Sequence, residues 1–488
     1  MSVGRRLTTG ALWASLETWG QQLVQLIVWA VLARLVGPEA YGLFGLAIVL
    51  VAAAQVLVLD AGWVEALMQR TEVGDTHLST VFWSLLALGL TLAGLVWLTA
   101  PLLATILGQP AIEPLVPWLG LVLPFTALNL VPHAILYRAL RFAPLTARTL
   151  AGTLVSSAVA LALAVAGYGA WSLVGLQLAV PLTEAIVLWY AAAWRPRTVW
   201  SRRHLAEIVG FVRWSLPDRA IEAVDNLLPR ALLGATLGTH ALGLYMLAWK
   251  VIELLTLLLT GPAVRVTIAA VARMGGDVSP ARLVAPALRG TALVACPAFL
   301  GLAAIAPDLV VVAFGDAWLP SATVLQVLAL MGLALPISRV AGAVLYGLGR
   351  VAWQLALSAG GLLVLLLLVS TLLPFGVVAV AAAYPIRALL MLPLVVALVE
   401  RGSGIALAPL LPSLLRIAIG AALMAALVVA ARHHAWPWLE PLPAALAGMA
   451  LGAVVYAVST LVLAREVTRD LLEVARARGR VDDGTLPG

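Results

Sequence analysis

Long apolar runs follow one another along nearly the whole chain, from Leu12 to Leu463, and only short polar segments separate them. A helical run of about twenty apolar residues matches the thickness of the hydrocarbon core of a bilayer. Inside lipid, such a run satisfies its backbone polar groups by forming a helix. The sequence is 63% hydrophobic and only 11% charged, a balance that excludes a water-soluble globule. It therefore predicts an all-α, polytopic membrane protein.

Hydropathy predicts about fourteen transmembrane helices, which places both ends of the chain on the same side of the membrane. The connecting loops are all short and leave no room for a catalytic domain outside the membrane. The predicted spans are Leu12–Ala33, Tyr41–Leu59, Thr80–Thr99, Leu115–Tyr137, Thr149–Ala166, Gly169–Ala193, Phe211–Gly234, Ala241–Ala270, Ala285–Ile305, Ala322–Leu345, Leu355–Leu373, Gly376–Val399, Leu410–Ala431 and Leu442–Leu463.

Basic residues gather on one side of this predicted topology. The opposite loops hold little beyond Arg34 and Arg432. Because cytoplasmic loops carry the excess of Lys and Arg, both termini are expected in the cytoplasm. Lys250 is the single lysine among the 30 basic residues, a composition typical of a GC-rich bacterial genome. The net charge of +7 is then a topology signal, and no nucleic-acid partner is expected. The residues on the cytoplasmic side are Arg5, Arg6, Arg70, Arg138, Arg141, Arg148, Arg195, Arg197, Arg202, Arg203, Arg273, Arg282, Arg350, Arg401, Arg465, Arg469, Arg476, Arg478 and Arg480.

The first two spans recur later in the chain as the seventh and eighth. At a constant offset, Gly37 aligns with Gly238 and Gly42 with Gly243, and the intervening turn is similar in sequence. This pattern predicts two parallel six-helix repeats, an N-lobe at 1–200 and a C-lobe at 201–400, with the working site between them. Two additional spans at 401–464 and a cytoplasmic tail at 465–488 have no partner in the repeat.

Polar residues interrupt several of the predicted spans. One face of the first span carries Glu17, Gln21 and Gln25, and the seventh span carries Asp218, Arg219, Glu222, Asp225 and Arg230. Lys250 and Glu253 lie one turn apart in the eighth span, Glu184 lies in the sixth and Arg387 in the twelfth. A charge at the bilayer centre costs at least about 2.5–3.5 kcal/mol, so these side chains must line a hydrated cavity or pair with one another. The sequence leaves both interpretations open.

Motifs of soluble enzymes are absent from the sequence. It contains no phosphate-binding GxxxxGKS loop, no HExxH and no cluster of Cys and His, and its one cysteine, Cys296, lies in an apolar run. We therefore expect no enzymatic activity, no metal site and no cofactor. Coupling to a proton or sodium gradient stays open.

Several segments resemble one known family. They are Leu32-Ala-Arg-Leu-Val-Gly-Pro-Glu-Ala-Tyr41-Gly-Leu, Asp60-Ala-Gly62-Trp-Val-Glu-Ala-Leu-Met-Gln69-Arg70, Tyr137-Arg-Ala-Leu-Arg141-Phe142 and Leu242-Gly-Leu-Tyr245-Met-Leu-Ala-Trp-Lys250. These are similar to bacterial polysaccharide-unit flippases, which belong to the multidrug/oligosaccharidyl-lipid/polysaccharide exporter superfamily. The resemblance covers about residues 5–400. One departure is Pro229, which stands where the family often carries an acidic residue before the Leu-Leu-Gly of the seventh span, and Asp225 lies one turn earlier.

The resemblance implies a transporter that flips an undecaprenyl-diphosphate-linked oligosaccharide by alternating access between two lobes. Its partners would be that lipid-linked substrate, the bilayer, and a polysaccharide polymerase and glycosyltransferases. We expect Lys250, Arg219, Arg230 and Arg387 to meet the diphosphate, and Glu17, Gln21, Gln25, Asp218, Glu222 and Asp225 to line the cavity or carry the coupling ion. The alternative is a drug or cation antiporter of the same superfamily. A membrane polymerase or ligase would need a large periplasmic loop, which the sequence lacks.

Overall fold

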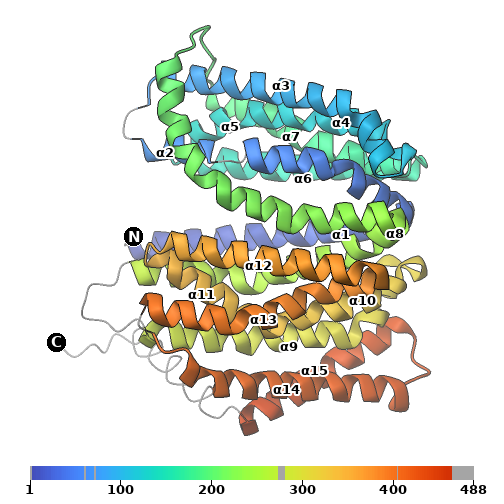
Figure 1. Ribbon diagram of the computed structural model, residues 1–488. Coiled ribbons are helices and arrows are strands. Elements are labelled where there is room, and N and C mark those ends of the chain that lie inside the picture. Colours follow the sequence, from blue (N-terminus) through green and yellow to red (C-terminus); the bar gives the residue numbers. More distant parts are fainter. Residues whose placement is uncertain (1–2, 60–61, 71–72, 273–280, 404, 464–488) are drawn as a thin grey trace, which may run out of the picture. The chain divides into compact units, whose positions relative to one another are not determined.

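The computed structural model describes residues 3–59, 62–70, 73–272, 281–403 and 405–463, and every element in these ranges is a helix (Figure 1). The chain forms two compact units, Met1–Met246 and Leu247–Gly488. The predicted lobe boundaries at 200 and 400 and the superposition of the two repeats stay predictions. The predicted tail at 465–488 lies outside the described residues.

In the first unit, α5 packs against both α3 and α7, and α6 packs along α7. Helix α1 contacts α6 and α7. The elements of this unit are α1 (Val3–Ala54), η1 (Gln55–Leu59), α2 (Trp63–Gln69), α3 (Asp75–Ile106), η2 (Pro110–Ile112), α4 (Leu115–Gly120), α5 (Val122–Arg138), α6 (Phe142–Val165), α7 (Ala170–Ala192) and the first part of α8 (Arg202–Ala272).

The second unit is built around α9, which packs against α10, α14 and α15. Its apolar core draws residues from α9, α11, α13 and α14, among them Ala292, Val344, Val399 and Ala421. The elements after α8 are α9 (Ala281–Phe314), η3 (Asp316–Trp318), α10 (Pro320–Ala329), η4 (Leu330–Leu333), α11 (Leu335–Gly347), α12 (Val351–Leu372), η5 (Leu373–Phe375), α13 (Val377–Ser403), η6 (Ala408–Leu410), α14 (Leu411–Ala430), η7 (Ala431–Ala435) and α15 (Pro441–Leu463).

Within the described residues, 11 helices are long and apolar enough to cross a membrane, or 12 if the pair Pro320–Leu333 and Leu335–Gly347, bent by 50°, is one span. Helix α1 together with η1 covers two of the predicted spans, and helix α8 covers two more, so this number accommodates the predicted fourteen. The prediction of an all-α, polytopic membrane protein is confirmed.

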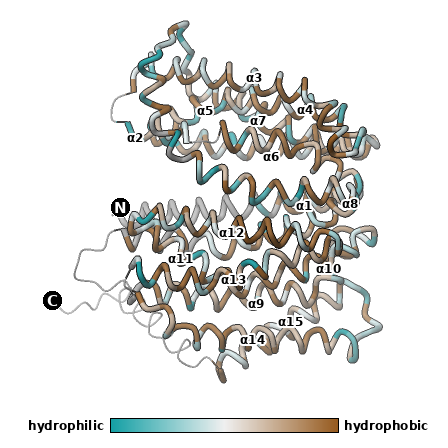
Figure 2. The backbone as a smooth tube through the Cα atoms, in the orientation of Figure 1, coloured by the Kyte–Doolittle hydropathy of each residue, from teal (hydrophilic) through white to brown (hydrophobic). Residues whose placement is uncertain are grey.

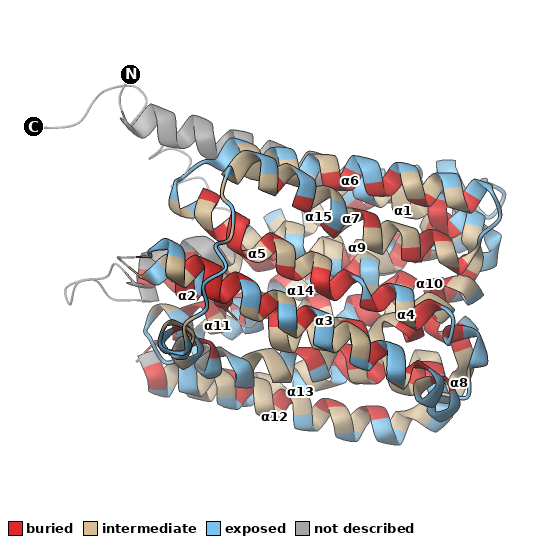
Figure 3. Cartoon of the chain, turned by 90° about the horizontal axis from the view of Figure 1, so that it is seen from above, coloured by how far each residue is buried: buried red, intermediate tan, exposed pale blue. Residues whose placement is uncertain are grey.

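Large apolar side chains are exposed along the helices, as expected where lipid replaces water. Leu98 is 77% exposed and Val165 75%. Figure 2 shows the apolar residues running along the helices, and Figure 3 shows buried and exposed residues alternating on the same helices. In a bilayer such exposed apolar surface is stable because lipid tails are as apolar as the side chains themselves.

Two glycines that the repeat pairs with each other share one unusual conformation. Gly37 has φ 79° and ψ 168° inside α1, and Gly238 has φ 85° and ψ 172° inside α8. A positive φ is strained for residues with a Cβ but not for glycine. Each glycine therefore breaks a long helix at the point where the sequence predicted a turn between two spans.

The residues just beyond these breaks lie close together in space. A Cβ on Gly42 would collide with the carbonyl oxygen of Thr239, and a Cβ on Gly243 would collide with that of Pro38. The two glycines, which the repeat also pairs, therefore allow the backbones of α1 and α8 to approach each other within the first unit.

The segment between α7 and α8 is bonded to α3. Asp75 forms an ion pair with Arg197 at 2.9 Å. The hydrogen bonds run from Trp83 Nε1 to Arg197 O (2.9 Å), Arg197 N to Ser79 Oγ (3.0 Å), Ser201 N to Thr80 Oγ1 (3.2 Å) and Trp200 Nε1 to Ser84 Oγ (2.9 Å). Close by, Arg70 Nη1 lies 2.8 Å from Glu207 Oε2 and joins the end of α2 to α8.

Candidate functional site: a polar cavity between α5, α6 and α7

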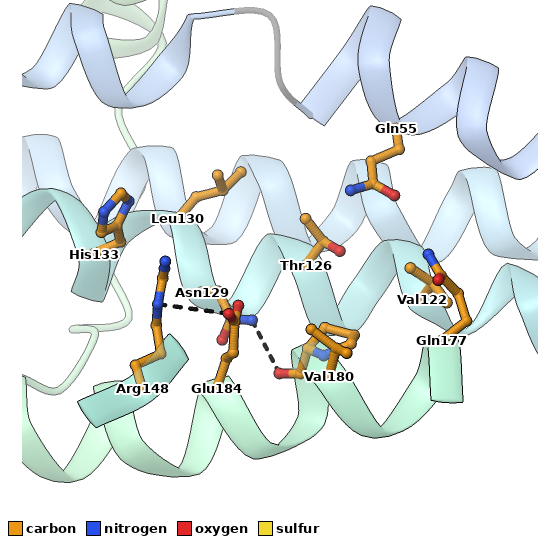
Figure 4. A pocket seen from close by; sticks show the side chains of 11 residues that line it. Gln55, Val122, Thr126, Asn129, Leu130, His133, Arg148, Gln177, Val180 and Glu184 are labelled. Carbon is orange, nitrogen blue, oxygen red and sulfur yellow. Dashed lines mark hydrogen bonds and ion pairs between the residues drawn. The ribbon is translucent and has the colours of Figure 1, made fainter. Parts of the chain in front are cut away.

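A polar cavity of about 310 Å³ lies between η1, α5, α6 and α7 in the first unit. In the view of Figure 4, Asn129 and Glu184 lie between His133 and Arg148 at one end and Gln55 and Gln177 at the other. We call it the Arg148–Glu184 cavity. Its lining residues are Gln55, Val122, Thr126, Asn129, Leu130, His133, Arg148, Gln177, Val180, Pro181 and Glu184.

An ion pair joins α6 to α7 across this cavity. Arg148 Nε lies 3.6 Å from Glu184 Oε1, and the two side chains are 20% and 19% exposed. Gly152, one turn after Arg148, makes room for the pair, since a Cβ there would lie 3.2 Å from Glu184 Cγ. The separation exceeds hydrogen-bonding distance, and Arg148 Nε is buried without a hydrogen-bond partner. The pair is therefore neutral in sum but keeps hydrogen-bonding capacity.

Asn129 connects α5 to α7 and leaves one polar atom toward the cavity. Its Nδ2 donates to the carbonyl oxygen of Pro181 at 2.9 Å. Its side chain is buried, with 6% exposure, and Oδ1 has no hydrogen-bond partner. Buried polar atoms normally have a partner, so an orphaned acceptor beside a cavity indicates that a ligand or a water completes it.

Pro181 shapes the α7 side of the same cavity. A proline has no backbone N–H, so the carbonyl one turn earlier, that of Gln177, lacks its usual helical donor. Both residues line the cavity. His133, one turn after Asn129 on α5, adds a further polar group. In the described part of the chain, no group of three or more His, Cys, Asp and Glu side chains is arranged to hold a metal ion.

The predicted site residues lie elsewhere, chiefly on α8. Lys250 Nζ lies 3.2 Å from Glu253 Oε2, and the two side chains are 51% and 56% exposed. Arg219 Nη1 lies 3.3 Å from Glu222 Oε2. The sequence left open whether these charges line a hydrated cavity or pair with one another, and both contacts are pairs of the second kind.

The other predicted residues have varied surroundings. Arg230 Nε is buried without a hydrogen-bond partner. The guanidinium of Arg387 lies 5.3 Å from the ring centre of Tyr384. Asp218 and Asp225 are half-buried and Gln25 is exposed, whereas the side chains of Glu17 and Gln21 lie outside the described residues.

Sequence reasoning found one member of the Arg148–Glu184 cavity, Glu184, and missed the others. It placed Arg148 in a cytoplasmic loop before a span that began at Thr149; the assignment to a loop was wrong, and the cytoplasmic side stays a prediction. Helix α6 begins at Phe142, so Arg148 lies in its second turn. The available signal was Glu184 itself, because a carboxylate inside a span requires a partner.

Comparison with known proteins identifies the family. The family model described as polysaccharide biosynthesis protein matches residues 31–323. The chain is 27% identical over 363 residues to the lipopolysaccharide biosynthesis protein WzxC of Escherichia coli (strain K12), covering 72% of each chain. It is 26% identical to the succinoglycan biosynthesis transport protein ExoT of Rhizobium meliloti (strain 1021), covering 97% of this chain and 96% of ExoT.

Among solved structures, the lipid II flippase MurJ in an inward closed conformation has the same fold. It superposes with a TM-score of 0.78 at 12% identity, covering 93% of this chain and 99% of MurJ. The region that the family model matches, residues 31–323, exceeds half of the sequence and contains α5, α6, α7 and α8. The resemblance of individual segments predicted this family. The chain belongs to the polysaccharide biosynthesis protein family.

Proposed function

We propose that this chain moves an undecaprenyl-diphosphate-linked oligosaccharide from the cytoplasmic to the periplasmic leaflet of a bacterial inner membrane. The product would serve exopolysaccharide, capsule or O-antigen synthesis. Relatives named for lipopolysaccharide and succinoglycan biosynthesis support the polysaccharide, and the fold shared with a lipid II flippase supports a lipid-linked substrate. A polymerase and glycosyltransferases would act after and before this step.

One observation carries the proposal: charged side chains stay exposed within the apolar helix α8. Lys250 and Glu253 are about half exposed, yet both lie in the candidate span Leu216–Gly261. Exposing them to lipid would cost at least about 2.5–3.5 kcal/mol each at the bilayer centre. Side chains in this position line a hydrated passage, which a polar glycan and its diphosphate need in order to cross.

The diphosphate requires cations held in place by partners. Lys250 beside Glu253 and Arg219 beside Glu222 have this arrangement, and Arg230 has a buried donor atom without a partner. We assign these three cations, with Arg387, to the diphosphate. The acidic and amide residues Glu17, Gln21, Gln25, Asp218, Glu222 and Asp225 would position the cations or carry a coupling proton or sodium ion.

A double-mutant test of Lys250 separates a ligand role from a structural one. In a host that lacks its own flippase, Lys250→Ala should reach normal membrane levels and abolish polymer export, and Lys250→Arg should retain part of it. If Lys250 meets the diphosphate, adding Glu253→Ala leaves export abolished. Recovery in the double variant would instead show that Lys250 only neutralises Glu253. Full export by Lys250→Ala would remove Lys250 from the site.

The alternative function, a drug or cation antiporter, is distinguished in the same host. An antiporter would lower susceptibility to lipophilic cations without restoring the polymer. The flippase proposal expects the polymer to be restored and susceptibility to be unchanged.

A further inference from the structure

The Arg148–Glu184 cavity is separate from the charged residues of α8 that we assign to the diphosphate, because its lining includes none of them. It nevertheless lies within the membrane-spanning helices of the first unit, since α5, α6 and α7 are all candidate spans. A cavity with polar lining residues between such helices calls for an explanation, because polar residues inside the membrane are costly and mark functional sites by default.

The charges that line the cavity favour a neutral ligand. Arg148 is offset by Glu184 at 3.6 Å, so no net positive charge is left for a diphosphate, and no net negative charge is left for a metal ion. His133 is the remaining ionisable group among the lining residues. A ligand that enters here has to supply hydrogen bonds rather than charge.

The hydrogen-bonding groups require a ligand that both donates and accepts. Asn129 Oδ1 is an unsatisfied acceptor and Arg148 Nε an unsatisfied donor, and both are buried. Gln55, Thr126 and Gln177 also line the cavity, and each of these side chains can both donate and accept hydrogen bonds. A hydroxyl group donates one hydrogen bond and accepts two, so a polyhydroxyl compound can satisfy both kinds of orphan at once.

The size of the cavity limits the ligand further. Small-molecule pockets measure about 300–1,000 Å³, and this cavity of about 310 Å³ lies at the lower end. That volume suits one or two sugar rings and excludes a polyprenyl chain. Asn129 is already held by its bond to Pro181, and Gly152 leaves space for Glu184, so the polar groups are positioned before a ligand arrives.

We propose that the Arg148–Glu184 cavity is a binding subsite for neutral sugar residues of the transported glycan, an inference that rests on the proposed flippase function. Asn129 Oδ1 and the Glu184 carboxylate accept hydrogen bonds from sugar hydroxyls, and Arg148 and Gln177 donate to them. The diphosphate and the sugars are thereby recognised by different sets of residues.

The test measures sugar binding directly, without requiring transport. The full chain is purified in detergent, and maltose, lactose, N,N′-diacetylchitobiose and inorganic pyrophosphate are each examined by saturation-transfer NMR. We expect at least one disaccharide to bind the wild type. Asn129→Leu and Gln177→Leu should each weaken that binding by about tenfold or more, the effect of losing one buried hydrogen bond. Pyrophosphate binding should not change in either variant.

The control is Gln354→Leu, the same substitution at a partly buried amide of α12 that does not line this cavity. It should bind the disaccharide as the wild type does. Asn129→Leu also removes the bond to Pro181. Gln177→Leu removes no side-chain hydrogen bond between the described helices, so it keeps the test meaningful if Asn129→Leu is poorly folded.

Three results would overturn the inference. They are a wild type that binds none of the disaccharides, binding that survives both cavity substitutions, and loss of pyrophosphate binding in these variants. The first means that the cavity holds water alone, the second that sugars bind elsewhere, and the third that it takes an anion. A protein that binds disaccharide through the cavity but never restores export contradicts the proposed function alone. A protein that restores export without such binding contradicts this inference alone.

Discussion

Arg432 and Asp308 form a bidentate ion pair. Arg432 Nε lies 2.9 Å from Asp308 Oδ2, and Arg432 Nη2 lies 3.0 Å from Asp308 Oδ1. Arg432 Nη1 also donates to the carbonyl oxygen of Trp436 at 2.8 Å. Asp308 is buried, with 8% exposure. The pair fixes η7, which directly follows α14, to α9 within the second unit. The additional helices α14 and α15 are therefore held to α9 by a specific polar contact as well as by apolar packing.

We predict that Arg432→Ala destabilises the protein by about 3 kcal/mol, since it leaves a buried carboxylate without its partner. Thermal unfolding in detergent measures this effect. His433→Ala, at an exposed neighbouring position of η7, is the control and should change stability by less than about 0.5 kcal/mol. Replacing both Arg432 and Asp308 by leucine should recover most of the loss. Unchanged unfolding of Arg432→Ala would show that the pair contributes nothing.

The close approach of α1 and α8 gives a second prediction. Gly42→Ala places a methyl group against the carbonyl oxygen of Thr239 and should destabilise the protein by about 1–3 kcal/mol. Gly94→Ala on α3 is the matched control, because open space surrounds its Cβ position and alanine favours a helix. Unfolding temperatures of the two variants are compared in detergent. If Gly42→Ala and Gly94→Ala unfold at the same temperature, the close approach of the α1 and α8 backbones is contradicted.

Acid should weaken the contact between α2 and α8. The hydrogen bond from Arg70, more than any other contact, lowers the pKa of Glu207 below its ordinary value of 4.5. A lowered pKa in the folded state adds stability above pH 4.5, and this stability is lost as the pH falls through the lowered value. We therefore expect Glu207→Gln to unfold at a lower temperature than the wild type at pH 7, with the two curves converging in acid.

The exposed residue Glu113 supplies the control for this titration, because it is a carboxylate of the first unit outside the Arg70 contact. Glu113→Gln should follow the wild type across the whole pH range. A constant difference between Glu207→Gln and the wild type from pH 7 into acid would exclude the pair with Arg70 as its cause.

Cysteine labelling tests the predicted orientation. The one native cysteine, Cys296, is buried, so new cysteines can be introduced into the wild-type chain. With a membrane-impermeant maleimide, we expect Trp438→Cys to react in intact spheroplasts and Thr198→Cys to react only after permeabilisation. Both positions are exposed in the structure. The reverse pattern would invert the orientation, and labelling of both in intact spheroplasts would contradict the span count between them.

Features that depend on neighbouring residues of one helix could be predicted from the sequence. The three-residue spacing of Lys250 and Glu253 places them on one face of a helix, and their side chains do meet. The breaks at Gly37 and Gly238 were also predicted, because each glycine begins a polar turn inside an apolar stretch.

The Arg148–Glu184 cavity could not be predicted because its members come from helices that meet only in the folded chain. In a hydropathy analysis a charged residue such as Arg148 marks the boundary of an apolar run, and so the predicted span began after it, at Thr149. In the fold the same charge is tolerated inside α6, since Glu184 of α7 lies opposite. Asn129 gave no signal of its own, because one amide in a span is unremarkable until the fold shows that its Nδ2 is bonded to Pro181 while its Oδ1 has no partner.

The segment joining α7 to α8 has a consequence for engineering the chain. By sequence it is the polar connection between two repeats, where inserted domains and chain breaks are usually tolerated. Here the backbone N–H groups of Arg197 and Ser201 donate hydrogen bonds to α3 side chains, so the connection is fixed to α3 along its length. An insertion at this point would break these hydrogen bonds to α3. A displacement of the start of α8 would move α3 as well, because the connection is bonded to both helices.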